Sequence, residues 1–155
     1  MGEPIKVDAA CVDLDVSSVD RDEILRYLSH LLERRGYVGE AYADAIVKRE
    51  HDYPTGLPFE HIAIAMPHAD PDDVSESAIA IGRCPKRPLF NSMETPGDQL
   101  PVDLVVLLAV KNPESHLAVL GNLIQLFCDD DNCKMLKESN DKTAICRLFD
   151  DVLQI

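Results

Sequence analysis

The sequence predicts an α/β fold, a three-layer sandwich with a mixed central sheet of about five strands and helices on both faces. Segments 62–66, 77–82 and 102–110 are mostly apolar, which is typical of strands covered on both sides. Segments with helical periodicity precede and follow them. No repeat, low-complexity tract or long linker divides the 155 residues, so we expect one domain over 1–155.

Two helices are expected before the first of these strands. Asp20 is placed to cap the first helix, with Glu23 three residues later, and Gly36 to end it. The apolar positions of this helix are Ile24, Leu25, Leu28, Leu31 and Leu32. A second helix, over about 40–50, is expected to bury Ala41, Tyr42, Ala45 and Ile46. The segment 51–58 has two prolines and a glycine, so we expect an irregular loop there.

The last third of the chain is expected to be helical. Asn112 and Pro113 are typical of a helix start. The apolar residues that follow at helical spacing are Leu117, Leu120, Leu123, Ile124 and Phe127. Shorter helices are expected over about 132–138 and 141–153. Between the strands, segment 83–100 is rich in Pro and Gly and is expected to form a long loop.

Composition excludes several classes of partner. The formal charge of −13 argues against nucleic acid and anionic membranes, which are bound through clustered Lys and Arg. The start of the chain lacks the apolar core of a signal peptide, and the longest apolar run, 104–110, is too short to span a bilayer. Five cysteines, an odd number without a C-x-x-C pair, are expected to be reduced. We therefore expect a cytoplasmic protein without direct membrane insertion.

The stretch Pro67-His68-Ala69-Asp70 is the most informative part of the chain. Proline cannot donate a hydrogen bond to a strand ladder, so Pro67 should end the apolar strand and leave His68 at the rim of the sheet. An imidazole there is a candidate nucleophile, general base, metal ligand or simple surface residue. Asp70 is expected to cap or tighten the turn that follows.

Other polar residues are placed to join His68. His116 lies in the first turn of the helix that follows another strand, and Arg49 lies at the end of a helix. Rims of this kind converge at the carboxyl ends of strands, where α/β proteins bind ligands. A helix start, an arginine and a second imidazole around one histidine form an anion site, and a phosphoryl group suits a reactive imidazole. Thr55 either donates its hydroxyl near that phosphate or begins a turn.

Four motifs, in this order and spacing, resemble one known family. They are Arg49-Glu50, Tyr53-Pro54-Thr55-Gly56-Leu57, Ile64-Ala65-Met66-Pro67-His68-Ala69-Asp70 and Pro113-Glu114-Ser115-His116-Leu117. The chain resembles the IIA domains of the bacterial sugar phosphotransferase system, of the fructose/mannitol class and galactitol-like. The resemblance covers about 18–153.

The resemblance implies a phosphoryl carrier. His68 would accept a phosphoryl group from the phosphocarrier protein HPr and pass it to a cysteine of a IIB component that serves a sugar permease. Nε2 would be the nucleophile, Arg49 would lie beside the phosphohistidine, and His116 would be the second active-site histidine. No metal or cofactor is implied. Leu57, Pro58, Phe59 and Met66 are expected to supply an apolar rim for docking partners.

Two other functions remain open from the sequence. The first is a regulatory module of the same fold, which signals through its phosphorylation state. The second is a metal-dependent hydrolase that uses His61, His68, Asp70 and His116, although the chain lacks a tight ligand motif such as H-E-x-x-H.

Overall fold

The computed structural model describes residues 4–154 and contains the predicted mixed sheet. Five strands lie in the order β1-β4-β7-β3-β2. Their bounds are β1 (Lys6–Asp13), β2 (Gly56–Pro58), β3 (Ala63–Ala65), β4 (Ala78–Arg83) and β7 (Leu104–Ala109). The pairs β1–β4 and β3–β7 are parallel, whereas β4–β7 and β2–β3 are antiparallel. The mixed five-stranded sheet is confirmed.

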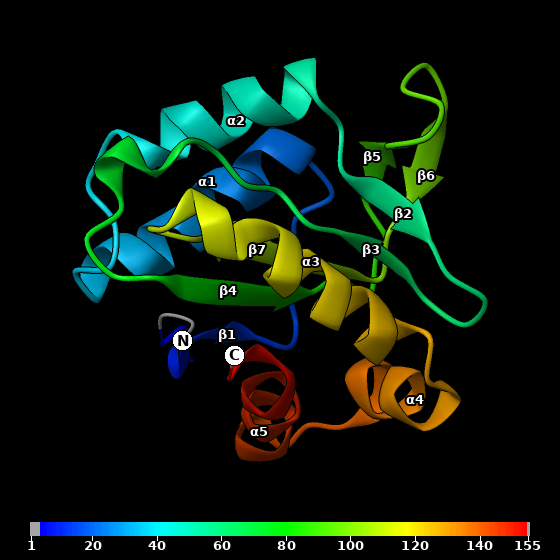
Figure 1. Ribbon diagram of the computed structural model, residues 1–155. Helices are drawn as coiled ribbons and strands as arrows, with labels where there is room; N and C mark the ends of the chain where they lie inside the picture. The colour runs from blue at the N-terminus through cyan, green and yellow to red at the C-terminus, as the bar shows by residue number, and fades with distance from the viewer. Residues whose placement is uncertain (1–3, 155) are drawn as a thin grey trace.

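Helices cover both faces of the sheet, so the three-layer arrangement is also confirmed (Figure 1). The helices are α1 (Arg21–Arg34), α2 (Tyr42–Asp52), α3 (Pro113–Phe127), α4 (Asp130–Glu138) and α5 (Lys142–Leu153). One buried cluster joins α1 and α2 to the sheet, and a second joins α3, α4 and α5 to the opposite face. β4 and β7 are buried along their whole length because both clusters include their side chains.

The first helix forms as its sequence predicts. The Asp20 carboxylate accepts a hydrogen bond from the Glu23 amide at 3.0 Å, and the five predicted apolar residues are buried. Gly36 follows the helix with a φ of 78°, a backbone conformation that glycine adopts without steric cost. In α2 the predicted buried face is partly wrong. Tyr42 and Ile46 are buried, but Ala41 and Ala45 are exposed, and Ala43 is buried instead.

The predicted core face of α3 is also partly wrong. Leu117 is 80% exposed and Ile124 is 38% exposed. The residues that α3 buries are Val119, Leu123, Leu126 and Phe127. This helix has apolar residues on more than one side, so its periodicity does not decide which side faces the sheet.

The two strands at the margins of the sheet, β1 and β2, are not among the strands predicted from the sequence. β1 contains two aspartates and a lysine, and β2 contains Gly56 and Pro58, so neither has the continuous apolar pattern of a central strand. Both are edge strands, where proline and polar residues are tolerated. The expectation of an irregular loop over all of 51–58 is therefore wrong.

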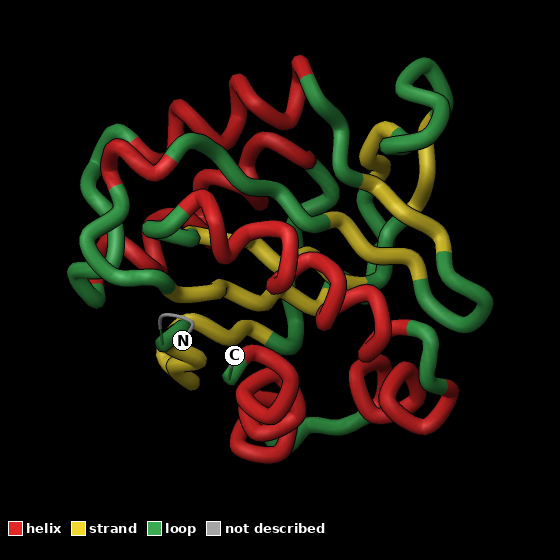
Figure 2. The backbone as a smooth tube through the Cα atoms, viewed as in Figure 1, coloured by secondary structure: helices red, strands yellow, loops and turns green. Residues whose placement is uncertain are grey.

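The long loop expected over 83–100 contains a hairpin instead. It is formed by β5 (Leu89–Asn91) and β6 (Gln99–Pro101), which pair antiparallel (Figure 2). Phe90 is fully buried in the cluster beneath α1 and α2, and this anchors the hairpin. A 3₁₀ turn, η1 (Pro71–Asp73), lies between β3 and β4. Within residues 4–154, no helix is long and apolar enough to cross a membrane.

Candidate functional site

His68 lies beside the carboxyl end of β7. β3 ends at Ala65, but the chain continues next to β7, where the Leu108 amide donates to the Pro67 carbonyl at 2.9 Å. His68 stands opposite Leu108 in a parallel bridge. The Tyr42 hydroxyl on α2 donates to the Leu108 carbonyl at 2.8 Å, so the α2 layer also supports this corner.

His116 reaches the same place from the next element. β7 ends at Ala109, and α3 begins at Pro113 with its amino end capped by Asn112, whose side chain accepts from the Glu114 amide at 3.0 Å. The rings of His68 and His116 have their centroids 4.4 Å apart and are tilted by 56°. The predicted convergence of the two imidazoles at one rim is therefore present in the structure.

The hydrogen bond on Nδ1 determines which nitrogen of His68 can react. Nδ1 lies 2.9 Å from the carbonyl oxygen of Met66. Because a carbonyl oxygen can only accept, Nδ1 must carry the proton. In the neutral ring this leaves the lone pair on Nε2.

His68, His116 and Arg49 line one shallow hollow of about 210 Å³. The rest of its lining is Ala69, Asp70, Pro71, Val110 and Pro113. Within the described part of the chain, the buried Arg49 Nε and His116 Nε2 atoms have no hydrogen-bond partner. Buried polar atoms are nearly always paired, so two unpaired ones in residues that line the same hollow mark these side chains as having unused hydrogen-bonding capacity.

Burial and Arg49 keep both imidazoles of the hollow neutral, and the lining also contains one acidic side chain, that of Asp70. Burial lowers the pKa of His68, and the positive charge of Arg49 lowers it further. Burial, His68 and Arg49 together lower the pKa of His116 to about 4. Neutral imidazoles retain a basic nitrogen at pH 7, while Arg49 supplies a fixed positive charge.

Comparison with known proteins decides the family. Residues 6–152 match the family described as the phosphoenolpyruvate-dependent sugar phosphotransferase system, EIIA 2. The chain belongs to this EIIA 2 family. A galactitol-specific EIIA component of Escherichia coli (strain K12) is 33% identical over 105 residues, which are 68% of this chain and 69% of that protein.

Solved structures agree with the assignment to the EIIA 2 family. The crystal structure of IIA mannitol from Escherichia coli matches with a TM-score of 0.77 and 25% identity, covering 94% of this chain and 99% of that one. A complex of enzyme IIA Mtl with phosphorylated enzyme IIB Mtl from Escherichia coli also matches, with a TM-score of 0.77 and 25% identity over 94% of this chain and 97% of that one.

Arg49 of this EIIA domain lies in the last turn of α2. Its guanidinium carbon stacks 4.4 Å from the centroid of the Tyr53 ring, and the Tyr53 amide donates to the Arg49 carbonyl at 2.7 Å. Tyr53 is 62% exposed, so its ring supports the arginine from the solvent side. Tyr53 belongs to one of the family-like motifs, but no role was predicted for it from the sequence.

Thr55 lies behind the hollow and is not among its lining residues. It is 2% exposed, and its hydroxyl donates to Glu50 Oε1 at 2.8 Å while accepting from the Met66 amide at 3.1 Å. Because the hydroxyl proton is already donated, it is not free for a ligand. Glu50 is only 1% exposed, and no role at the site was predicted for it from the sequence.

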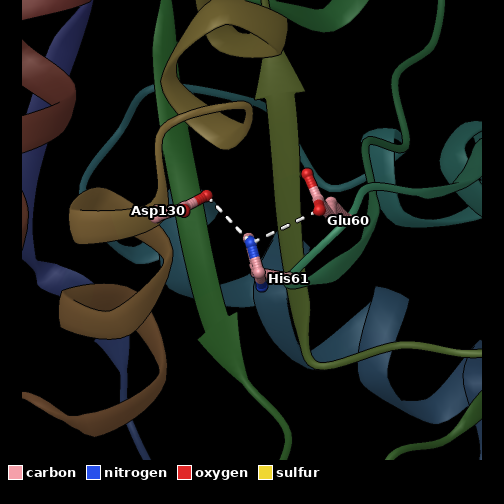
Figure 3. Close-up of side chains that lie close together, drawn as sticks. All are labelled: Glu60, His61 and Asp130. Carbon is pink, nitrogen blue, oxygen red and sulfur yellow. Dashed lines mark ion pairs between the residues drawn. The ribbon is translucent and has the colours of Figure 1, made fainter.

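The predicted metal-ligand set does not come together. His61 precedes β3 and His68 follows it, so they lie at opposite ends of this strand. His61 lies instead between Glu60 and Asp130, with Nε2 2.9 Å from the Asp130 carboxylate (Figure 3). Asp70 is exposed at the start of η1 and makes no capping hydrogen bond through its side chain. The hydrolase hypothesis based on these four residues is therefore wrong.

The prediction of an apolar docking rim around His68 is also wrong, because the predicted residues lie away from His68 or in the core. Leu57 pairs with Ile64 and Pro58 with Ala63, so β2 runs toward the beginning of β3 and away from His68. Phe59 packs on Phe127, at the far end of α3 from His116. Met66 is 1% exposed and belongs to the core.

Burial of Glu50 gives the protein's stability a pH dependence. Burial raises the pKa of Glu50 from 4.5 to about 7, although the hydrogen bonds from Thr55 oppose the shift. The folded state binds this proton more tightly than the unfolded state. The contribution of the Glu50 proton to the stability of the fold is therefore complete below about pH 4.5, and it is lost as the pH rises through about 7.

Glu50→Gln removes this titration. We expect the free energy of unfolding of the variant, relative to wild type, to increase by up to about 3 kcal/mol between pH 4.5 and pH 8. Urea unfolding at a series of pH values measures the difference. A difference that does not change with pH would contradict a raised pKa for Glu50.

Proposed function

We propose that this EIIA domain is a phosphoryl carrier that accepts a phosphoryl group on Nε2 of His68 from phospho-HPr and passes it to a cysteine of a IIB component. The observation that carries the proposal is the Nδ1 bond to the Met66 carbonyl, which leaves Nε2 as the basic nitrogen. The hollow that His68 shares with Arg49 and His116 provides the surroundings an anion needs.

The chemistry requires one bond to form as another breaks. The Nε2 lone pair attacks phosphorus in line, and the electron pair of the bond to the donor leaves with HPr. Nδ1 keeps its proton and donates a hydrogen bond to the Met66 carbonyl throughout, which stabilises the positive charge on the phosphorylated ring. In the second transfer a cysteine thiolate of IIB attacks phosphorus, and the lone pair returns to Nε2. Every step is reversible, and no proton has to leave His68.

Arg49 and His116 would stabilise the phosphoryl oxygens without bonding to phosphorus. Arg49 and His116 each keep one buried nitrogen without a hydrogen-bond partner, Nε and Nε2, so their side chains have hydrogen-bonding capacity left for this role. A phosphoryl dianion beside His116 would raise its pKa from about 4, because the charged imidazolium then gains a partner. Preorganised donors of this kind act mainly by positioning and electrostatics.

Replacing His116 by alanine should slow phosphoryl transfer by about 10- to 100-fold without abolishing it, since one donor is lost and the nucleophile remains. Rapid-quench measurement of transfer from phospho-HPr gives the rate. His30→Ala is a matched control, because His30 is an exposed histidine on α1 outside the hollow. A wild-type rate in His116→Ala would limit His116 to a structural role.

The relatives support a transport role with a IIB partner. The galactitol-specific relative is 33% identical, and a IIA domain of the same fold is known in complex with phosphorylated IIB. We therefore propose that this domain serves a sugar system of the galactitol or fructose/mannitol type. The five free thiols fit the reducing cytoplasm, where phospho-HPr would be met.

Intact-mass spectrometry of the protein mixed with phospho-HPr, without added metal, tests the proposal. We expect one phosphoryl adduct, which is lost in acid, survives alkali and disappears when a IIB component with its cysteine is added. A IIB component with that cysteine replaced by serine is the control and should leave the adduct in place. No adduct on a folded wild-type protein would overturn the proposed function.

A further inference from the structure

The backbone that delivers His68 is held on its two sides by different means. On the β7 side, main-chain hydrogen bonding continues as far as Pro67. On the β2 side, regular pairing ends with Gly56 opposite Ala65. The next amide, that of Met66, donates to the Thr55 hydroxyl instead of to a main-chain carbonyl. Pro67 faces β7, because its carbonyl accepts from the Leu108 amide, so the Met66 amide makes the last bond that this segment donates toward β2 before His68.

Glu50 fixes the direction of that hydroxyl. Its carboxylate accepts both the amide and the hydroxyl proton of Thr55, each at 2.8 Å. With the hydroxyl proton directed at Glu50, the oxygen lone pairs are left for the Met66 amide. The bonds form a continuous path from Glu50 through Thr55 and Met66 to Nδ1 of His68.

The burial of these hydrogen-bonded polar groups indicates that they do more than fill space in the core. A carboxylate that is 99% removed from solvent is costly to keep, and an apolar side chain would fill the same space more cheaply. Thr55 is 2% exposed and its only hydroxyl makes two hydrogen bonds. These polar groups are therefore fully used, and their last link is the carbonyl that selects the reactive nitrogen of His68.

We propose that Glu50 and Thr55 are positioning residues that hold Met66 in place, so that its carbonyl keeps the proton of His68 on Nδ1 and leaves Nε2 free to react. Neither residue touches the phosphoryl group. The inference rests on the proposed function, because the choice of nitrogen matters only if Nε2 attacks phosphorus. It assigns a role to the buried glutamate next to Arg49.

Two substitutions of Thr55 separate positioning from packing. Thr55→Val keeps the shape and removes the hydroxyl, whereas Thr55→Ser keeps the hydroxyl and removes a buried methyl group. If Thr55 positions Met66, the valine variant is impaired and the serine variant is close to wild type. If Thr55 contributes only to packing, the serine variant is impaired and the valine variant is close to wild type. Glu50→Gln, which keeps the shape but cannot accept both bonds from Thr55 with the same strength, should behave like Thr55→Val.

The direct readout is the tautomer of His68 in the unphosphorylated protein, measured by ¹⁵N–¹H NMR of the imidazole at a pH where the ring is neutral. We expect a single Nδ1–H form in wild type and in Thr55→Ser. In Thr55→Val and Glu50→Gln we expect a mixture with Nε2–H, and transfer from phospho-HPr slowed by about 10-fold, the typical effect of losing one buried hydrogen bond.

Several results would overturn the inference. Folded Thr55→Val and Glu50→Gln variants that keep a pure Nδ1–H tautomer would do so, whatever their transfer rates. A serine variant impaired as much as the valine variant would also do so. If a variant fails to fold, the wild-type spectrum alone still tests the path, because an Nε2–H tautomer there would refute it. The tautomer is read without phosphate, so failure of the proposed function would be seen separately, as absence of transfer to wild type.

Discussion

His68→Gln should accept no phosphoryl group from phospho-HPr, although the protein should fold as wild type does. Glutamine has no basic nitrogen, and the remaining groups of the hollow cannot form the bond to phosphorus. Arg49 has no available lone pair, and the pKa of about 4 for His116 makes its imidazole a weak base and therefore a poor substitute nucleophile. Intact-mass spectrometry after incubation with phospho-HPr measures the loss.

The matched control is His61→Gln, which removes an exposed histidine at the opposite end of β3. We expect full phosphorylation of this control. Circular dichroism and thermal unfolding should show that both variants are folded. A phosphoryl adduct on folded His68→Gln would show that another residue is the acceptor.

Arg49→Gln should slow transfer from phospho-HPr by about 100- to 1,000-fold. Arg49 is the one permanently positive side chain among the lining residues of the hollow, so its loss removes the fixed positive charge available to the phosphoryl oxygens. Arg49→Lys keeps the charge but loses the planar group that stacks on Tyr53, so we expect an intermediate rate. Rapid-quench kinetics with phospho-HPr measures all three proteins.

Lys48→Gln is the control for the Arg49 variants. It removes the same charge one residue earlier on α2, from an exposed position that does not line the hollow. We expect its transfer rate to stay within a few-fold of wild type, because exposed charges act weakly at a distance. Equal slowing in Lys48→Gln and Arg49→Gln would show that net charge, and not the placement of Arg49, controls the rate.

The parts of the site that the sequence could predict follow from the ends of elements. Pro67 ends a buried strand and Asn112 caps a helix, so His68 and His116 were both expected at the rim of the sheet, and the 4.4 Å between their rings agrees with this. The sequence signals that predict these positions are local, namely a proline, a helix-capping residue and an apolar run. They can be recognised without knowing which strands are neighbours in the sheet.

The parts that could not be predicted depend on register and on burial. The path from Glu50 to Met66 exists because β2 pairs with β3 so that Thr55 lies next to Met66, and β2 itself has no strand pattern in the sequence. The same register removes Pro58 from the vicinity of His68. In α3, Leu117 and Leu123 are equally apolar, and only packing on the sheet decides that Leu123 is buried.

The central claim is that Nε2 of His68 carries the phosphoryl group while Nδ1 keeps its proton. NMR of ¹⁵N-labelled protein after phosphorylation by phospho-HPr tests it directly, through the ³¹P–¹⁵N coupling and the imidazole ¹⁵N shifts. We expect the phosphorus to couple to Nε2 of His68, with the proton still on Nδ1 as in the bond to Met66. Coupling to Nδ1 of His68, or to either nitrogen of His116, would contradict the account.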